Sequence, residues 1–344
     1  MTKCPIGHSK LGRRAALSGG LGAVCALAAP VLGIRGTGRA QGAPWPTRPV
    51  TLVVGFPPGG QTDFAARVVQ PGLSAALGQT VVIENRGGAN GNLATEAVLR
   101  ARPDGYTLSM GREATQAINP HVLPGAAAID PLRLTPIGVA LQSSMVLCVH
   151  PSVPARNVQE LVAWVRSQPG RVDYGSPSVG SLSHLSMELF RNRIGDPPME
   201  HVSYRGSGPA MQDFIAGRFS LMFDVASVMA PFLRANQVRG LFVASDHRIP
   251  AFSDIPTAAE QGLRDFIIVA WAGLFGPPGL PPEIVRKAHG ALTQVLRDAA
   301  TRERITGQGD EPGGDMTPEQ LGGLMRGDHA RWGEVVRANN IRSE

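Results

Sequence analysis

A short glycine-rich loop between an apolar run and a polar stretch holds the residues of this sequence best suited to chemistry. Residues 51–54 are apolar or β-branched and predict a buried strand. Gly59 and Gly60 follow with bare backbone, and residues 61–63 (Gln-Thr-Asp) offer N-caps for a helix. N–H groups at a helix start lack intrahelical acceptors and lie at the positive dipole end, so the loop predicts a seat for an anion. An ordinary strand-to-helix turn is the alternative.

The residues at the helix start narrow the kind of anion. A phosphate-binding P-loop places a Lys followed by Ser or Thr there, whereas this chain has Gln61, Thr62 and Asp63. The G-x-G-x-x-G fingerprint of dinucleotide-binding proteins is also absent around Gly59 and Gly60. The carboxylate of Asp63 would disfavour a highly charged phosphate. We therefore expect a small carboxylate rather than a nucleotide.

Three serines and a histidine follow a short strand that is predicted at residues 172–174. Ser176, Ser178 and Ser181 could donate hydroxyl groups to a ligand, or could simply cap the helix that follows. His184 is predicted on a face of that helix. Ser178, His184 and Asp224 have the side-chain types of a hydrolase triad, but no G-x-S-x-G surrounds them.

Three further residues could contact a ligand, and each has a structural alternative. Asp224 lies at the carboxyl end of a predicted strand, where it could hold water, pair with an amine or cap a helix. Arg205 could pair with a substrate carboxylate or stay solvated on its loop. Tyr204 is predicted to lie partly in the core and partly on a cleft wall.

The chain has no H-E-x-x-H or paired C-x-x-C, and its eight histidines are scattered. We therefore expect no catalytic residue, no metal and no cofactor.

The charge distribution indicates export rather than nucleic-acid binding. The formal charge of +6 comes from residues 1–40, which hold six Lys and Arg and no acidic residue; without them 27 basic side chains remain against 27 acidic. Arg13 and Arg14, followed by a Gly- and Ala-rich apolar stretch, predict an export signal cleaved near Ala40. Paired arginines favour the twin-arginine route to the periplasm, with the general secretory route or a retained anchor as alternatives. Cleavage would leave Cys148 as the only thiol.

Alternating strands and helices predict an α/β fold with doubly wound sheets. A second buried strand is expected at residues 81–83, with Asn92 capping the next helix, and a loop is expected at 111–120. Pro71 should kink or break the first helix. A long strand at 137–150 leads to a second set of units, and residues 266–275 resemble a strand that returns to the first set. Pro209 suits the first position of a helix over 210–216.

Short motifs spread over the chain resemble one family, the TctC/Bug solute-binding receptors of tripartite tricarboxylate transporters. They occur in order and at family-like spacing over essentially the whole chain beyond residue 40. The motifs are Trp45-Pro-Thr-Arg-Pro-Val with Phe56-Pro-Pro-Gly-Gly, Glu84-Asn-Arg, Pro103-Asp-Gly-Tyr-Thr-Leu, Ile118-Asn-Pro, Tyr174-Gly-Ser, His201-Val-Ser-Tyr with Gly206-Ser-Gly-Pro, and Leu221-Met-Phe-Asp.

The resemblance implies a two-lobed type II periplasmic-binding-protein fold, closing on a small carboxylate between lobes joined by two crossing strands. Lobe 1 is expected at 43–145 plus 265–344 and lobe 2 at 146–264. The implied ligand-binding residues are Phe56, Gly59, Gly60, Gln61, Asp63, Thr115, Ser176, Ser178, Ser181, His184, Tyr204, Arg205, Gly206 and Asp224. Glu113 departs from the small hydroxyl residue common in relatives, and its carboxylate would repel an anionic ligand if it points inward.

The resemblance further implies a function. We expect an exported, monomeric receptor that captures a small organic carboxylate and presents it to membrane permease subunits, without nucleic acid. A second hypothesis is a ligand-sensing partner of a periplasmic signalling receptor, which would use the same cleft. A periplasmic hydrolase is a third.

Overall fold

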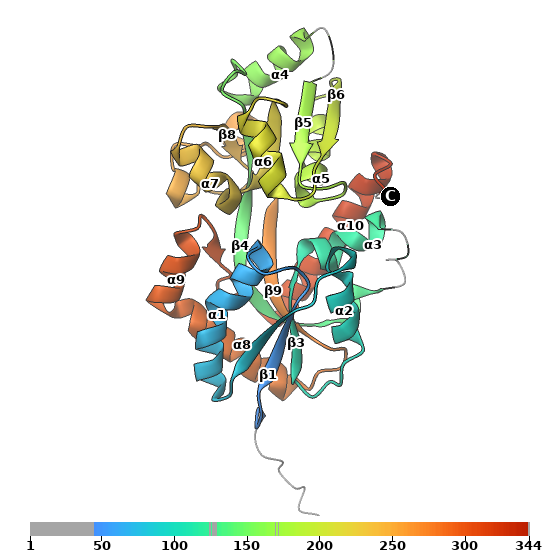
Figure 1. Cartoon of the computed structure of the whole chain (residues 1–344), viewed down its shortest axis with the longest axis vertical. Coiled ribbons are helices and arrows are strands. Elements are labelled where there is room, and N and C mark those ends of the chain that lie inside the picture. Colours follow the sequence, from blue (N-terminus) through green and yellow to red (C-terminus); the bar gives the residue numbers. More distant parts are fainter. Residues whose placement is uncertain (1–44, 124, 126–128, 169, 171, 343–344) are drawn as a thin grey trace, which may run out of the picture. The chain divides into compact units, whose positions relative to one another are not determined.

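One long strand, β4 (Thr135–Val149), joins two sets of parallel strands in this computed structural model (Figure 1). The structure describes residues 45–123, 125, 129–168, 170 and 172–342. The predicted export signal at 1–40 and its cleavage site lie outside these residues. The described residues form one compact unit, and the predicted lobe boundaries stay a prediction.

The first set of strands carries the predicted anion seat. Its parallel members, paired in the order β2, β1, β3, are β1 (Val50–Val54), β2 (Val81–Asn85) and β3 (Thr107–Arg112). β9 (Val269–Gly276) lies antiparallel between β3 and β4, and the two-residue β10 (Glu311–Pro312) also pairs with β4. The prediction that residues 81–83 form a fully buried strand is wrong, because β2 is the edge strand and Val82 is 47% exposed.

The second set of strands pairs with the other half of β4. Its members are β5 (Val172–Ser176), β6 (Met199–Ser203), β7 (Leu221–Val225) and β8 (Arg239–Val243). β5 is parallel to β6 and β7, while β7 and β8 run antiparallel to β4. Figure 1 shows β4 and β9 running together between the two sets. The predicted fold class, an α/β fold of doubly wound sheets joined by two crossing strands, is confirmed.

The strand register brings the carboxyl ends of both sets to the middle of β4. Arg112, the last residue of β3, pairs with Ala272 of β9, which pairs with Leu141. Val225, the last residue of β7, pairs with Met145. Ligands of open α/β sheets lie beyond the carboxyl ends of strands. Residues 141–145 therefore mark the place where loops from both sets meet.

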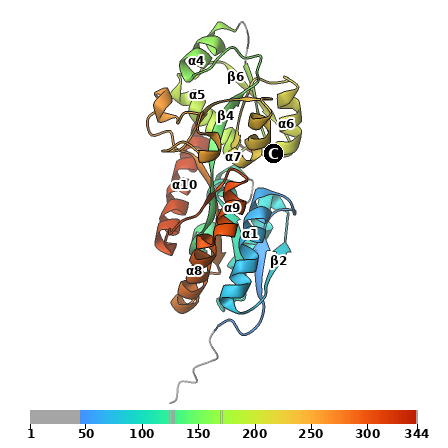
Figure 2. The same cartoon turned by 90° about the vertical axis from the view of Figure 1, so that its left-hand side faces the viewer.

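Helices cover the faces of both sets (Figures 1 and 2). Those around the first set are α1 (Gln61–Leu77), α2 (Asn92–Leu99), α3 (Asn119–Val122), α8 (Pro282–Arg297) and α9 (Ala299–Thr306). Those around the second are α4 (Val158–Ser167), α5 (Leu182–Arg193), α6 (Ser207–Ile215) and α7 (Ala226–Arg234). No helix in the part of the chain that the structure describes has the length and apolar character needed to cross a bilayer.

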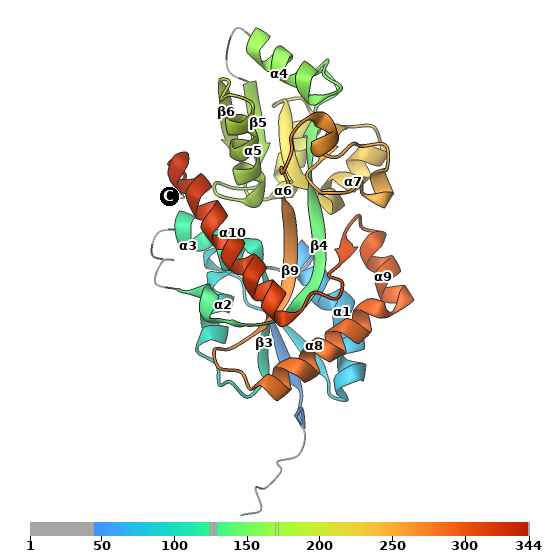
Figure 3. The same ribbon diagram turned by 180° about the vertical axis from the view of Figure 1, so that it is seen from behind.

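The last helix, α10 (Pro318–Ala338), ties the two sets together from behind (Figure 3). Its first half packs Leu321 and Met325 into a cluster with Phe275 of β9. Its second half packs Trp332 and Val336 into the core of the second set. Thr317 begins the helix with a complete capping box, so the sequence itself sets where α10 starts.

Several local predictions are wrong for identifiable reasons. The predicted break at Pro71 does not occur: α1 runs on through this residue, which lies on its exposed face together with Arg67, the residue whose carbonyl loses its donor. Residues 61–63 do not cap α1, because its N-cap is Gly60. Asn92 is the first residue of α2 rather than its cap, and its side chain accepts from Asn119.

Two further boundaries also differ from the sequence prediction. The loop predicted at 111–120 is instead the end of β3, one π-helical turn at Ala114–Ile118 and the start of α3. α6 begins at Ser207, so Pro209 is its third residue rather than its first. At the first of these places the π-helical turn begins almost directly at the carboxyl end of β3, which ends at Arg112.

Replacing Gly313 should destabilise the fold, because this residue lies directly against β4. A Cβ there would lie 2.1 Å from the carbonyl oxygen of Val139. We expect Gly313→Ala to lower the free energy of unfolding by about 2 kcal/mol, measured by urea denaturation. The control is Gly323→Ala on the exposed face of α10, where a Cβ meets nothing within 4 Å. Equal stability of the two variants would contradict the close packing of this segment on β4.

Candidate functional site

The first loop, residues 55–60, leaves its backbone open where α1 begins. Gly59 and Gly60 are exposed, and Gly59 has a φ of 92°, which favours glycine. A Cβ at Gly59 would meet nothing within 4 Å, and one at Gly60 only the Pro57 carbonyl oxygen at 4.0 Å. The first N–H groups of α1 have no acceptor within the helix. The loop thus has the open main chain and the helix start that an anion seat needs.

Asp63 supports this loop from beneath instead of facing outward. Its buried carboxylate accepts from the Gly59 N–H at 2.9 Å, from Arg67 Nε at 2.8 Å and from Asn85 Nδ2 at 2.9 Å. Burial alone would raise the pKa of Asp63, but these donors outweigh it and lower the pKa. The N–H of Gly59 is therefore already used within the loop, and the N–H groups from Gly60 onward remain for a ligand.

Arg112 lies beside the first loop, although the sequence did not single it out. Its guanidinium carbon is 5.7 Å from the centre of the Phe56 ring. Thr115 closes the turn after β3 by donating its hydroxyl to the Arg112 carbonyl at 3.1 Å. A Cβ at Gly91 would lie 2.6 Å from Thr115 and 3.0 Å from Phe56. Phe56 and Thr115 are thus packed together, and the cation at the end of β3 lies next to them.

The carboxylate of Glu113 does not face the site as an unpaired charge. It is 1% exposed, and Oε1 accepts from Arg112 Nη2 at 2.6 Å while Oε2 accepts from the Trp271 N–H at 3.1 Å. Arg112 and Glu113 therefore compensate each other. The repulsion of an anionic ligand that Glu113 alone would cause is largely removed.

Asp224 lies buried at the carboxyl end of β7. Its carboxylate accepts from the Ser207 hydroxyl at 2.7 Å and from the Val225 N–H at 2.8 Å. Burial raises the pKa of Asp224 to about 6, although Ser207, Val225, Arg112 and Ser183 all oppose the shift. The influence of Arg112 on Asp224 shows that the strand ends of the two sets lie within electrostatic reach of each other.

The predicted serines hold their own loop together. Ser176 and Ser181 both donate to the Ser178 carbonyl, at 2.9 and 2.8 Å, and Ser181 is the N-cap of α5. His184 Nδ1 accepts from the Gly180 N–H, and its ring stacks on that of His201 with centroids 3.7 Å apart. Only Ser181 thus has the capping role that was the alternative for the serines, while the polar groups of Ser176 and His184 are bonded within this segment.

The loop after β6 holds residues that a ligand could reach and one residue, Tyr204, whose polar group is bonded within the chain. The Tyr204 hydroxyl donates to Asp213 at 3.0 Å, so the ring faces α6 and the core. Arg205 is exposed, and Gly206, the N-cap of α6, has a φ of 110° with open space around it. The Gly206 N–H itself donates to the Pro177 carbonyl at 2.8 Å. The side chain of Arg205 and the open space beside Gly206 are therefore accessible to a ligand in a way that the Tyr204 hydroxyl is not.

Asp310 is a second residue that the sequence did not single out. It precedes β10 and is 2% exposed, among Gln61, Ser143 and Ser227. Neither carboxylate oxygen forms a hydrogen bond of good geometry within the described residues. The register of β10 on β4 places Asp310 there, and a two-residue strand has almost no sequence signal. Within the same residues, no three His, Cys, Asp or Glu side chains are grouped to hold a metal.

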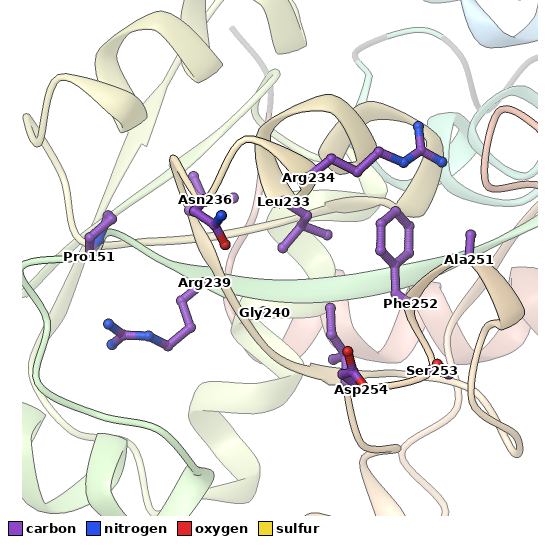
Figure 4. A pocket seen from close by; sticks show the side chains of 12 residues that line it. Pro151, Leu233, Arg234, Asn236, Arg239, Gly240, Ala251, Phe252, Ser253 and Asp254 are labelled. Atoms are coloured by element: carbon purple, nitrogen blue, oxygen red, sulfur yellow. The ribbon is translucent and has the colours of Figure 1, made fainter.

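A separate pocket of about 410 Å³ lies at the other end of α7 (Figure 4). It is lined by Leu233 and Arg234 from that end, by the start of β8 and by residues 251–255. Arg234 lies over the Phe252 ring, 5.6 Å from its centre. None of the predicted ligand residues lines this pocket, so the candidate site remains at the middle of β4.

These features define a class of protein. Two sets of parallel strands, joined by two crossing strands with glycine-rich loops at the meeting point, form the fold of a periplasmic solute-binding receptor. Residues 65–341 match the model of the tripartite tricarboxylate transporter family receptor, TctC. The chain belongs to this family, whose members are solute-binding receptors and not enzymes, so the resemblance is confirmed and the hydrolase hypothesis falls.

Similar proteins cover nearly the whole chain. BugT of Bordetella pertussis is 31% identical over 87% of this chain and 91% of its own length. Among solved structures, Rpa4515 of R. palustris with adipate is 34% identical with a TM-score of 0.76, covering 87% of this chain and 100% of that one. MatC (Rpa3494) of Rhodopseudomonas palustris with bound malate is 33% identical with a TM-score of 0.73, covering 85% and 100%.

The stacked histidines should make the protein less stable in mild acid. Burial lowers the pKa of His201 to about 4, and burial with the neighbouring His201 and Arg191 lowers that of His184 to about 3. The unfolded chain therefore takes up protons first as the pH falls below about 6.5. Stability is complete above that pH and is lost between about 6.5 and 4 for His201.

Urea denaturation at pH 7.5 and 5.0 tests this effect. We expect His201 alone to cost about 2 kcal/mol of unfolding free energy at pH 5.0, so His201→Gln should show that much less acid loss than the natural protein. An identical pH dependence of the two proteins would mean that His201 titrates equally in the folded and unfolded chains.

Proposed function

We propose that this protein captures a small organic carboxylate where its two sets of strands meet and delivers it to a tripartite tricarboxylate-type membrane permease. The open main chain at Gly60, directly before α1, is the observation that carries this proposal. The adipate in Rpa4515 and the malate in MatC support it, since both ligands are dicarboxylates.

The binding mode follows from which groups are free. One carboxylate of the ligand is held by the N–H groups of Gly60 and Gln61 at the positive end of α1. The exposed side chain of Arg205 contacts the ligand from the second set, and the absence of a side chain at Gly206 leaves room for the ligand beside it. Other predicted residues, such as Asp63 and Ser176, are hydrogen-bonded within the chain. These residues hold the loops in place. The remaining residue, Ser178, contributes its hydroxyl to the ligand.

Hinge closure about β4 and β9 is the proposed mechanism. Contacts to the first set alone form when the ligand enters, and contacts to the second set form only as the sets approach. These additional contacts supply the free energy for closure.

The proposal also includes the location of the receptor. A twin-arginine signal with Arg13 and Arg14 directs export to the periplasm, and the signal is cleaved near Ala40.

A panel of mono-, di- and tricarboxylates tests the capture of an anion. We expect at least one of them to raise the melting temperature, since a ligand at 100 times its Kd adds about 2.7 kcal/mol of stability. Gly60→Val should weaken that ligand at least tenfold by calorimetry, because the branched side chain covers the N–H groups of the loop.

The fold of this variant should persist, since Gly60 has φ −83° and ψ 170°, which valine adopts readily. The matched control is Gly290→Val on the exposed face of α8, where a Cβ meets nothing within 4 Å. This variant should bind the carboxylate as tightly as the natural protein. Unchanged affinity of Gly60→Val would remove the first loop from the site.

Delivery to a permease is tested separately, by crosslinking the loaded receptor to native membranes and identifying the captured protein. We expect a subunit of a tripartite permease. Recovery of a sensor kinase in its place would contradict delivery and support the signalling hypothesis.

A further inference from the structure

We propose that Asp310 forms a subsite for an ammonium group, so that the carboxylate captured by this protein also carries an amino group. The inference rests on the proposed function and names the chemical class of its ligand: amino acids rather than simple dicarboxylates.

The backbone holds Asp310 at the meeting point of the two sets. In the antiparallel pair of β10 and β4, Glu311 is opposite Gln142, which places Asp310 opposite Ser143. On its other side, a Cβ at Gly309 would lie 3.5 Å from the backbone of Ala226, the first residue of α7. Asp310 is therefore fixed between the middle of β4 and the start of α7, next to the strand ends from which ligand contacts are expected.

The surroundings of Asp310 leave its charge without a counter-ion. Both oxygens are buried and lack a hydrogen bond of good geometry, and so do Gln61 Nε2 and Ser143 Oγ beside it. Arg112 is the cation that acts on Asp310, yet its Nε and Nη2 are engaged by Glu113. A buried carboxylate without a close cation is costly, and burial raises the pKa of Asp310, although the nearby donors of Ser143, Ser227 and Gln61 and the charge of Arg112 oppose the shift.

The groups around Asp310 suit an ammonium ion. An ammonium carries three donors and no acceptor. The carboxylate and the hydroxyl oxygens of Ser143 and Ser227 can all accept from it, while Gln61 presents its Nε2, a donor, to the carboxylate. Gln61 is also the first residue of α1, directly after Gly60. The ammonium subsite and the carboxylate seat thus adjoin each other, as the two groups of an amino acid do.

The charge balance of the site favours the same class of ligand. Arg112 and Glu113 compensate each other, which leaves the buried carboxyl groups of Asp224 and Asp310 without a full counter-charge. A simple dicarboxylate brings only more negative charge to this place. An ammonium group on the ligand removes the imbalance at Asp310 while the carboxylate remains on the N–H groups of the first loop.

Matched pairs of ligands test the inference at pH 7.5: succinate with aspartate, glutarate with glutamate, and propionate with alanine. By calorimetry we expect the amino member of the best pair to bind the natural protein at least tenfold more tightly. Asp310→Asn should reduce that ratio to about one and leave the affinity of the member without the amino group nearly unchanged. The control is Asp315→Asn, an exposed carboxylate paired with Arg297, which should keep the full ratio.

The melting temperature without ligand provides a second readout. Asn has nearly the same shape and no charge, so Asp310→Asn should melt at the same or a higher temperature if the carboxylate awaits a ligand. A lower melting temperature would mean that Asp310 is bonded within the chain, and would overturn the inference. Equal or tighter binding of succinate, glutarate and propionate would overturn it too, while leaving the proposed function intact. Binding of none of the carboxylates would overturn both.

Discussion

The shared strand β4 is the constraint on which this structure depends. Its first ten residues pair with β9 of the first set, and its last five pair with β7 of the second. Since β3 and β7 both end near residues 141–145 of β4, their loops are brought to one place by hydrogen-bonded register alone. The site is therefore built from backbone geometry before any ligand contact is considered.

Several carboxylates are buried near residues 141–145 of β4, and they differ in how their charge is compensated. Two carboxylates near the meeting point have partners within the chain that include a cation: Asp63 is paired with Arg67 and Asn85, and Glu113 with Arg112 and a main-chain N–H. Asp224 has a hydroxyl and an N–H but no close cation. Asp310 feels the charge of Arg112, which is hydrogen-bonded to Glu113, and neither of its oxygens forms a well-formed hydrogen bond within the described residues. The fold thus separates carboxylates that serve its own loops from those whose partner comes from elsewhere.

The sequence reveals local features and misses distant ones. It predicts β1 and the long strand β4, because the hydrophobic runs that form them lie within a few residues of each other. It also indicates the open glycines of the first loop. It misses Arg112 and Asp310, which gain meaning only through partners far along the chain. A rule that searches for cations at the carboxyl ends of strands would have found Arg112, but no local rule finds Asp310.

The central claim is that a carboxylate binds to the N–H groups at the start of α1. Hydrogen exchange, followed with and without a saturating carboxylate, measures those groups directly. We predict slower exchange at residues 60–62, and slower exchange at 205–208 from the second set. A ligand that binds while exchange at residues 60–62 stays unchanged would show that the anion is held elsewhere and would contradict the account.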